Sequence, residues 1–241
     1  MALSAPFDFK FNPQAKIRSE YIGRERQPLL VIDNVLRQPE AMIGFASSAR
    51  FGAPPQGSYY PGVNALLPPG YGASLVAALR PLLERGFGLP RDKILTHEGF
   101  FGLTTYGPGE LEPLQCVPHF DSSNPFRLAV VHYFCGEPFS GTAFFRHLPT
   151  QYESVQGPVR FETFRARVTF ELENDAPPKA YVDDATPRYE QIAHVDAAFD
   201  RLVVYRTTSL HAAIMSGAPL SADPAKGRLT ANSFIDVSAA A

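Results

Sequence analysis

Three separated segments carry side chains that could together bind a metal ion and a small anion. His119-Phe120-Asp121 lies near the middle of the chain, His211 follows far downstream, and Arg228-Leu229-Thr230 comes later still. Two imidazoles and one carboxylate are the ligands of a facial triad, which holds Fe(II) and leaves three positions open for chemistry. The guanidinium of Arg228 and the hydroxyl of Thr230 suit an anionic carboxylate. An oxygenase that uses such an iron centre needs a carboxylate of this type as its co-substrate.

The chain contains a second H-x-D triplet, His194-Val195-Asp196, so the first needs support from its position. A strand places residues i and i+2 on one face, and His119 and Asp121 can therefore point the same way. His119 lies far enough before His211 for several strands to intervene. His194 instead lies just ahead of an expected strand, so it fits a loop or the start of that strand. A sheet that wraps around a metal must bring distant strands together, and the sequence therefore favours the triplet at His119.

The expected position of the arginine follows from the turn before it. Ser216–Pro219 and Asp223–Gly227 are rich in Ser, Gly, Asp and Pro, which is typical of a turn between two strands. If the chain reverses near Pro219 and Leu220, His211 falls roughly opposite Arg228–Thr230. Metal ligand and carboxylate anchor would then share one pocket. Taken alone, Arg228 fits better as a surface residue of a strand.

Composition argues against several classes of function. The chain has 241 residues, of which 45% are hydrophobic and 12% aromatic, enough for one substantial core. The formal net charge is -2 and no Lys/Arg cluster is interleaved with aromatics, so nucleic acid is not an expected partner.

The first residues lack a secretory pattern and no long apolar run occurs, so we expect a cytoplasmic protein without a membrane segment. Cys116 and Cys135 fit no zinc pattern and are expected to be free thiols in or near the core.

Helical signals concentrate in the first hundred residues. The apolar run Leu29–Ile32 predicts a strand. Pro39 and the residues through Ala49 predict a helix, because proline suits the first helical position. Ala73–Leu83 predicts a second helix despite Pro81. These elements are expected to support a sheet formed later in the chain.

From about Thr96 the sequence changes to short runs rich in Phe, Val, Tyr and Thr, separated by Gly and Pro, which is typical of strands and turns. We expect one domain over residues 1–241, mainly β with helical additions, in which 1–95 is an N-terminal helical support region and 96–241 is a barrel or jelly roll. Glu171–Pro187 is expected to be an exposed loop or lid. The predicted strands are Phe100–Tyr106, Leu128–Cys135, Thr142–Phe145, Val159–Phe170, Arg201–Arg206 and Leu229–Val237.

These segments resemble the core of a known family over roughly residues 100 to 236. The matching stretches, in order, are Leu103–Gly109, His119–Asp121, Val131–Cys135, Ser140–Phe145, Arg201–Tyr205, Leu210–His211 and Gly227–Thr230. In order and spacing they resemble the prolyl 4-hydroxylase-like branch of the Fe(II)/2-oxoglutarate-dependent dioxygenases. The resemblance implies a double-stranded β-helix, a cupin-like jelly roll, packed against the N-terminal helices.

The resemblance also implies a role for seven residues. Three features depart from the family pattern. Collagen-type members have Lys where this chain has Arg228, Tyr133-Phe134-Cys135 matches the family's Tyr-Leu-Asn only in part, and the segment at about 146–195 is a long insert. Tyrosines on strands are as often plain core residues, so two of the accessory assignments stay open. The implied residues are His119, Asp121 and His211 for iron, Arg228 for the distal carboxylate of 2-oxoglutarate, and Thr230, Tyr133 and Tyr106 as accessory residues.

The implied activity is hydroxylation of a C–H bond with O2 and 2-oxoglutarate, which gives succinate and CO2 as co-products. Related halogenases replace the carboxylate ligand with a small residue, so Asp121 favours hydroxylation. The substrate would be an amino acid, a peptidyl side chain or a small metabolite. Two alternatives stay open: a cupin-like metal-binding protein without 2-oxoglutarate chemistry, and a non-catalytic binding module on the same fold. Sheet edges in such barrels can also pair in a homodimer.

Overall fold

Two antiparallel sheets and three α-helices make up most of the computed structural model, which describes residues 9–215, 217 and 219–237. The strands are β1 Lys16–Ile22, β2 Gln27–Asp33, β3 Gly62–Leu66, β4 Leu95–Thr104, β5 Leu128–Tyr133, β6 Thr142–His147, β7 Tyr189–Val195, β8 Arg201–Arg206, β9 His211–Ala213 and β10 Arg228–Val237. The helices are α1 Glu40–Ser48, α2 Tyr71–Phe87 and α3 Gly157–Asn174, and two short 3-10 helices lie at Pro108–Glu110 and Pro113–Cys116.

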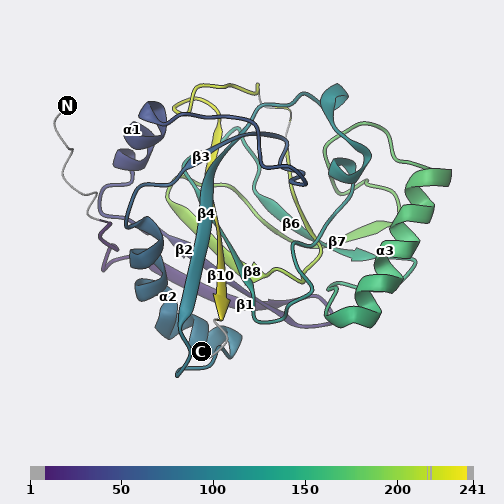
Figure 1. Cartoon of the computed structure of the whole chain (residues 1–241), viewed down its shortest axis with the longest axis horizontal. Helices are drawn as coiled ribbons and strands as arrows, with labels where there is room; N and C mark the ends of the chain where they lie inside the picture. The colour runs from purple at the N-terminus through teal and green to yellow at the C-terminus, as the bar shows by residue number, and fades with distance from the viewer. Residues whose placement is uncertain (1–8, 216, 218, 238–241) are drawn as a thin grey trace.

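The strand order gives the two sheets of a jelly roll. The larger sheet runs β1-β2-β8-β5-β10-β4-β3 and the smaller runs β7-β6-β9, with antiparallel pairing throughout. Helices α1 and α2 lie at one end of the view in Figure 1, and α3 lies at the other end, beyond the smaller sheet. The prediction of a mainly β, jelly-roll fold with helical additions is confirmed. None of the helices in the described ranges is both long and apolar enough to cross a membrane.

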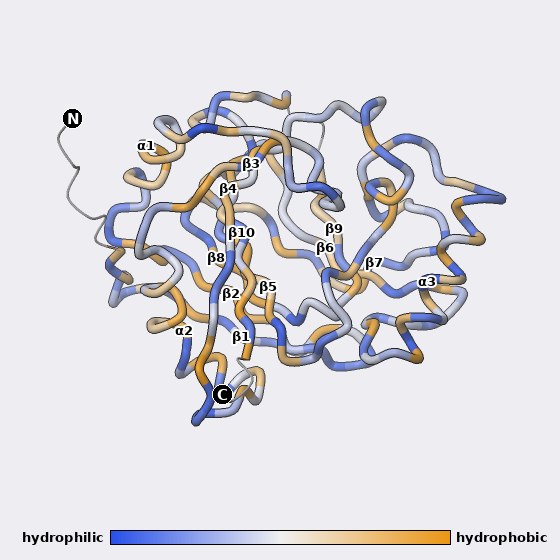
Figure 2. The backbone as a smooth tube through the Cα atoms, in the orientation of Figure 1, coloured by the Kyte–Doolittle hydropathy of each residue, from blue (hydrophilic) through white to orange (hydrophobic). Residues whose placement is uncertain are grey.

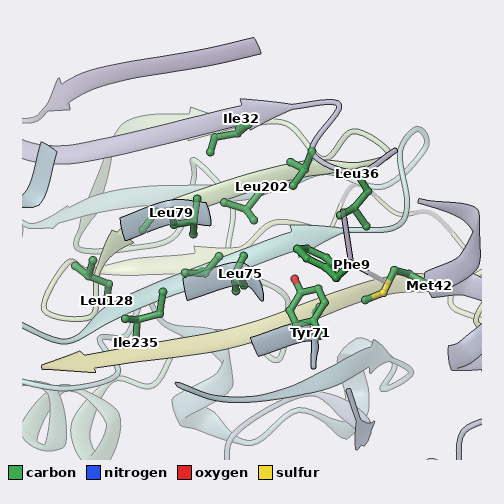
Figure 3. Close-up of a cluster of buried hydrophobic side chains, with 14 of the residues drawn as sticks. Phe9, Ile32, Leu36, Met42, Tyr71, Leu75, Leu79, Leu128, Leu202 and Ile235 are labelled. Atoms are coloured by element: carbon green, nitrogen blue, oxygen red, sulfur yellow. The ribbon is translucent and has the colours of Figure 1, made fainter. Parts of the chain in front are cut away.

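Helix α2 covers the outer face of the larger sheet. Its residues Leu75, Leu79 and Leu83 recur every four positions and are fully buried, in one cluster with side chains of β2, β5, β8 and β10 (Figure 3). The helix ends at Phe87 and is capped by Gly88, which has a positive φ of 66° that glycine adopts without strain. The predicted packing of the β core against the N-terminal helices is therefore confirmed.

The inner face of the larger sheet looks toward the smaller sheet. Alternation along the strands turns Tyr133 of β5 and both Val203 and Tyr205 of β8 inward, where they share a buried cluster with Phe144 of β6. Hydrophobic stretches accordingly run along the central strands in Figure 2. Side chains from both sheets therefore meet in the space between them.

The predicted strand at Val159–Phe170 is wrong, because this segment lies in α3. Its Phe, Val and Thr content favours a strand, but the buried Phe164 and Val168 lie four positions apart, as on one face of a helix. An ion pair at the same spacing, Arg167 with Glu171 at 2.6 Å, adds to the helix. The predicted loop Glu171–Pro187 consequently begins inside α3, where Glu171 is buried.

The N-terminal region contributes more than helical support. Besides α1 and α2 it supplies β1, β2 and β3, which include both edge strands of the larger sheet. Of these strands the sequence predicts only β2, so the description of residues 1–95 as a helical region is incomplete.

In the insert, β7 pairs with β6 and extends the smaller sheet. The predicted turn at 216–219 includes residues 216 and 218, which lie outside the described residues.

A buried ion pair joins the smaller sheet to the turn between β1 and β2. Arg146 of β6 donates from Nε to Glu153 at 2.8 Å, and both side chains are almost fully buried. Glu153 also accepts hydrogen bonds from the backbone N–H groups of Arg24 and Glu25, at 3.0 and 2.8 Å. The same guanidinium reaches a second carboxylate, Glu190, which is half exposed.

We expect Glu153→Gln to lower the free energy of unfolding by about 3 kcal/mol, because it leaves the charge of Arg146 buried without its main partner. The matched substitution Glu190→Gln should cost less than about 1 kcal/mol, since water screens an exposed pair. Denaturant unfolding at pH 7 measures both values. Equal effects of the two substitutions would contradict the assignment of the stabilisation to the buried pair.

Candidate metal centre and anion site

Backbone pairing between distant segments positions the three predicted metal ligands. The N–H of His119 donates to the carbonyl of His211 at 2.9 Å, and the N–H of His211 donates to the carbonyl of His119 at 2.8 Å. Two residues further on, the N–H of Asp121 donates to the carbonyl of Thr207 at 2.9 Å. The loop that carries His119 and Asp121 is therefore held along the segment that leads into β9.

The side chains of His119, Asp121 and His211 converge. His119 Nε2 lies 3.8 Å from Asp121 Oδ1, and His211 Nε2 lies 3.7 Å from Asp121 Oδ2. Their ligand atoms all lie within 4.8 Å of one another, and the described residues contain no other such group of His, Cys, Asp or Glu. His194 instead lies on β7, with Nδ1 3.5 Å from the carboxylate of Asp196. Of the two H-x-D triplets, the one at His119 is thus brought to His211.

The two imidazoles offer nitrogen atoms in the form that binds a metal. His211 Nδ1 lies 3.0 Å from the carbonyl of Ser209 and donates its hydrogen there, which leaves the lone pair of Nε2 on the side of Asp121. Burial lowers the pKa of His211 to about 4. Partial loss of water around its ring and the neighbouring His211 lower the pKa of His119 to about 4, against the effect of Asp121. Both rings are therefore neutral near pH 7.

The carboxylate completes the donor set. Burial raises the pKa of Asp121, while His119 and Arg127 act in the opposite direction. A bound cation would favour the ionised form further. Two neutral imidazoles and one carboxylate fit a divalent metal such as Fe(II).

Arg228, the predicted carboxylate anchor, is buried at the start of β10. Nη2 donates to the carbonyl of Gly141 at 3.0 Å and Nε to that of Ser140 at 3.4 Å, and no carboxylate of the described residues pairs with this guanidinium. Arg146, the other buried arginine among the described residues, has two carboxylate partners. Because a buried charge without a counter-charge is unfavourable, the guanidinium of Arg228 is suited to an anionic ligand.

Two of the predicted accessory residues lie beside Arg228. Thr230 follows two positions later on the same face of β10 and is paired with Tyr133 on β5. The guanidinium of Arg228 lies 5.6 Å from the centre of the Tyr133 ring. The Tyr133 hydroxyl lies 2.5 Å from Thr142 Oγ1. The hydroxyls of Tyr133 and Thr230 are neutral groups that can donate to an anion.

Tyr106, the third accessory residue, is placed differently. Its backbone carbonyl accepts a hydrogen bond from the hydroxyl of Tyr181 at 2.7 Å. It also lines a surface pocket of about 260 Å³, together with Tyr59, Tyr60 and Glu110. Among the described contacts, none joins Tyr106 to Arg228.

Strand β6 links the metal ligands to the arginine. Phe144 is paired with His211 of β9, and their rings lie 6.5 Å apart. Three positions earlier in the chain, Gly141 accepts the hydrogen bond from Arg228. At about 3.3 Å per residue this corresponds to about 10 Å along the strand. The metal ligand His211 and the guanidinium of Arg228 are therefore both attached to this short segment.

The prediction that His211 and Arg228 lie opposite each other in a hairpin is wrong. β9 pairs with β6 in the smaller sheet, whereas β10 pairs with β4 and β5 in the larger one. The two residues instead lie on different sheets and are linked through the segment around β6, where His211 is paired with Phe144 and Arg228 donates to Gly141. Short-range turn chemistry predicts a reversal of the chain but not the sheet that each strand joins.

Two tyrosines that no motif indicates also face the space between the sheets. The ring of Tyr205 on β8 lies 4.7 Å from that of His211, and burial followed by Asp121 raises the pKa of its hydroxyl. Tyr205 lies on the same face as Val203 in a predicted strand whose side chains alternate between the two faces, so its inward direction could have been inferred. Tyr60 lies in a loop, where periodicity gives no direction.

Comparisons with known proteins relate the chain to one family and to several solved structures, two of which are described here. The family model of DUF6445, described as a family of unknown function, matches residues 13–235. A crystal structure of HygX from Streptomyces hygroscopicus with nickel, 2-oxoglutarate and hygromycin B bound is similar, with a TM-score of 0.50 and 14% identity, over 89% of this chain and 84% of that one. No curated protein matches.

The second structure is a novel N-substituted L-amino acid dioxygenase from Burkholderia ambifaria AMMD. Its TM-score is 0.38 and its identity 11%, over 87% of this chain and 82% of that one. At 14% identity, the likeness to HygX concerns the fold alone.

Proposed function

The chain belongs to DUF6445, a family of unknown function, and we propose that it is a non-haem Fe(II)/2-oxoglutarate-dependent dioxygenase of the prolyl 4-hydroxylase-like branch. The observation that carries the proposal is a His-Asp-His group linked through the segment around β6 to a buried arginine that has no carboxylate partner among the described residues. A metal group alone suits many proteins. Together with the guanidinium of Arg228, the metal group suits a co-substrate that chelates a metal at one end and carries a carboxylate at the other.

His119, Asp121 and His211 would hold the metal on one side and leave its other positions to ligands. The hydrogen bond from His211 to Ser209 would keep that ring in the correct orientation and tautomer. When bound, iron supplies the oxidation in which 2-oxoglutarate and O2 yield succinate, CO2 and a hydroxylated substrate.

Arg228 would bind the distal carboxylate of 2-oxoglutarate, with Thr230 and Tyr133 as neighbouring donors. The buried surroundings would strengthen this interaction, because few water molecules compete for the carboxylate there. Tyr106 would act from the adjacent pocket and not through contact with Arg228.

The substrate would approach from the side of His119. About 52% of the His119 side chain is exposed, compared with 7% of the His211 side chain, so the group opens to solvent there. The substrate class that we propose is an amino acid, a peptidyl side chain or a small metabolite with a C–H bond to be hydroxylated.

Anaerobic titration of the apo-protein with Fe(II) and then 2-oxoglutarate tests the proposal. We expect a visible metal-to-ligand charge-transfer band that requires both additions, because a 2-oxo acid must chelate the iron to produce it. On admission of air, 2-oxoglutarate should be converted to succinate, and removal of iron with a chelator should abolish the conversion. Zn(II) is the matched control, since it suits the same donors and has no redox chemistry.

Two results would contradict the proposal. Metal binding without the band would favour a cupin-like metal-binding protein that does not use 2-oxoglutarate. Absence of metal binding would favour a non-catalytic binding module on the same fold.

A further inference from the structure

Tyr60 reaches the anion site from outside the segments that resemble the dioxygenase core. It precedes β3, and its ring packs edge-on against Phe100 of β4 with ring centres 5.9 Å apart. Its hydroxyl lies 3.2 Å from Thr104 Oγ1. Thr104 is the direct partner of Arg228 in the pairing of β4 with β10. Because paired residues share one face of a sheet, Tyr60 covers the part of the inner face from which Arg228 projects.

The neighbouring strand leaves room for this hydroxyl at Gly102. A Cβ atom at this position would lie 2.5 Å from the Tyr60 hydroxyl and 2.5 Å from Asn232 Nδ2, closer than such atoms can approach. Gly102 is paired with Thr230 on β10. Lack of a side chain at Gly102 therefore allows Tyr60 to reach the two residues predicted to bind the co-substrate, Arg228 and Thr230.

The surroundings keep Tyr60 as a hydrogen-bond donor. Burial raises the pKa of its hydroxyl, and the charge of Arg228 is the largest opposing effect, followed by hydrogen bonds with Thr104 and Thr230. The phenol is therefore protonated near pH 7. Since a threonine hydroxyl can donate as well as accept, Thr104 can supply the hydrogen of their shared bond and free that of Tyr60.

An anion at Arg228 needs donors beyond the guanidinium. A carboxylate offers about four acceptor sites, and Arg228 already directs Nε and Nη2 toward the carbonyls of Ser140 and Gly141. We propose that Tyr60 binds the distal carboxylate of the co-substrate together with Arg228, and so positions it from the loop before β3. This inference rests on the proposed function and adds a residue that lies outside the segments matched to the dioxygenase core.

Tyr60→Phe tests the inference, with Tyr59→Phe as the matched control. Tyr59 is the adjacent tyrosine and is about half exposed, so loss of its hydroxyl should leave the Kd of 2-oxoglutarate unchanged. In anaerobic titrations of the Fe(II)-loaded protein, Tyr60→Phe should raise the Kd of 2-oxoglutarate about 10-fold, as expected for loss of a hydrogen bond to a charged group. Turnover should show a higher KM for 2-oxoglutarate and a similar kcat at saturation.

A second ligand separates a direct contact from a structural effect. 2-Oxobutyrate has the chelating 2-oxo acid but no distal carboxylate, so Tyr60→Phe should leave its Kd unchanged. Gly102→Ala should weaken 2-oxoglutarate in the same selective way, because its methyl group displaces the Tyr60 hydroxyl. Equal weakening of both ligands by Tyr60→Phe would overturn the inference in favour of a structural role.

The inference and the proposed function fail in different ways. If wild type and Tyr60→Phe bind 2-oxoglutarate equally well while Arg228→Ala does not, the inference is overturned and the proposed function stands. If the wild-type protein with Fe(II) does not bind 2-oxoglutarate, both are overturned.

Discussion

His211→Ala is expected to weaken Fe(II) binding by more than about 100-fold, because loss of even an outer hydrogen-bond partner of a metal ligand weakens binding by about 10–100-fold. His211 is the most buried of the three candidate ligands, and the other two lie on one short loop beside it. Anaerobic titration with Fe(II), followed by 2-oxoglutarate, measures the effect through the charge-transfer band, which should disappear.

His194→Ala is the matched control, since it removes a histidine from the second H-x-D triplet. His194 lies on β7 away from His211, so this variant should bind Fe(II) like the wild type. Loss of the band in His194→Ala and its retention in His211→Ala would reject the metal centre proposed here.

Arg228→Ala is expected to weaken 2-oxoglutarate by at least about 30-fold, because truncation of one partner of a buried, hydrogen-bonded charge pair costs about 2–5 kcal/mol. Fe(II) binding should persist, because Arg228 is not one of the candidate metal ligands. It donates to Gly141, three positions before Phe144, the residue paired with His211. The measurement is the Kd of 2-oxoglutarate for the Fe(II)-loaded protein, and retained Fe(II) affinity shows that the variant is folded.

Arg206→Ala provides the control for removal of a guanidinium. Arg206 ends β8 and also donates to backbone carbonyls, those of Phe87 and Pro125, but it is only partly buried and packs over the ring of Phe87. This variant should bind 2-oxoglutarate like the wild type. A similar loss of affinity in both variants would indicate that the effect of Arg228→Ala is general destabilisation.

Much of the β core follows from local sequence pattern. Arg201–Arg206 is a strand with the predicted bounds, and Leu229–Val237 differs from β10 by one residue. The strand predicted from residue composition at Val159–Phe170 was wrong. Residue types that favour strands occur there at helical spacing, and the helix buries Phe164 and Val168. The edge strand β1 was not predicted because it has no run of apolar residues, and all of its residues except Ile22 are exposed.

The candidate site could be predicted in parts. The identity and separation of His119, Asp121 and His211 were sufficient to nominate the group, because a sheet that wraps around a metal must bring strands distant in the sequence together. The position of Arg228 relative to His211 was harder to infer. The turn residues before Arg228 predict that the chain reverses, but they do not predict which sheet the next strand joins. Tyr60 could not be found from the sequence, since its direction depends on the missing side chain at Gly102, which lies far away in the chain.

The two candidate histidine ligands are also joined through their main chains. Reciprocal hydrogen bonds connect His119 and His211, and in such an antiparallel pair the Cα atoms lie about 5.5 Å apart whatever side chains they carry. Their spacing is therefore fixed when the chain folds, before any ion arrives. In this respect the protein differs from a zinc finger, which folds only around its metal. Ions can then be taken up, lost or exchanged while the backbone frame that receives them stays in place.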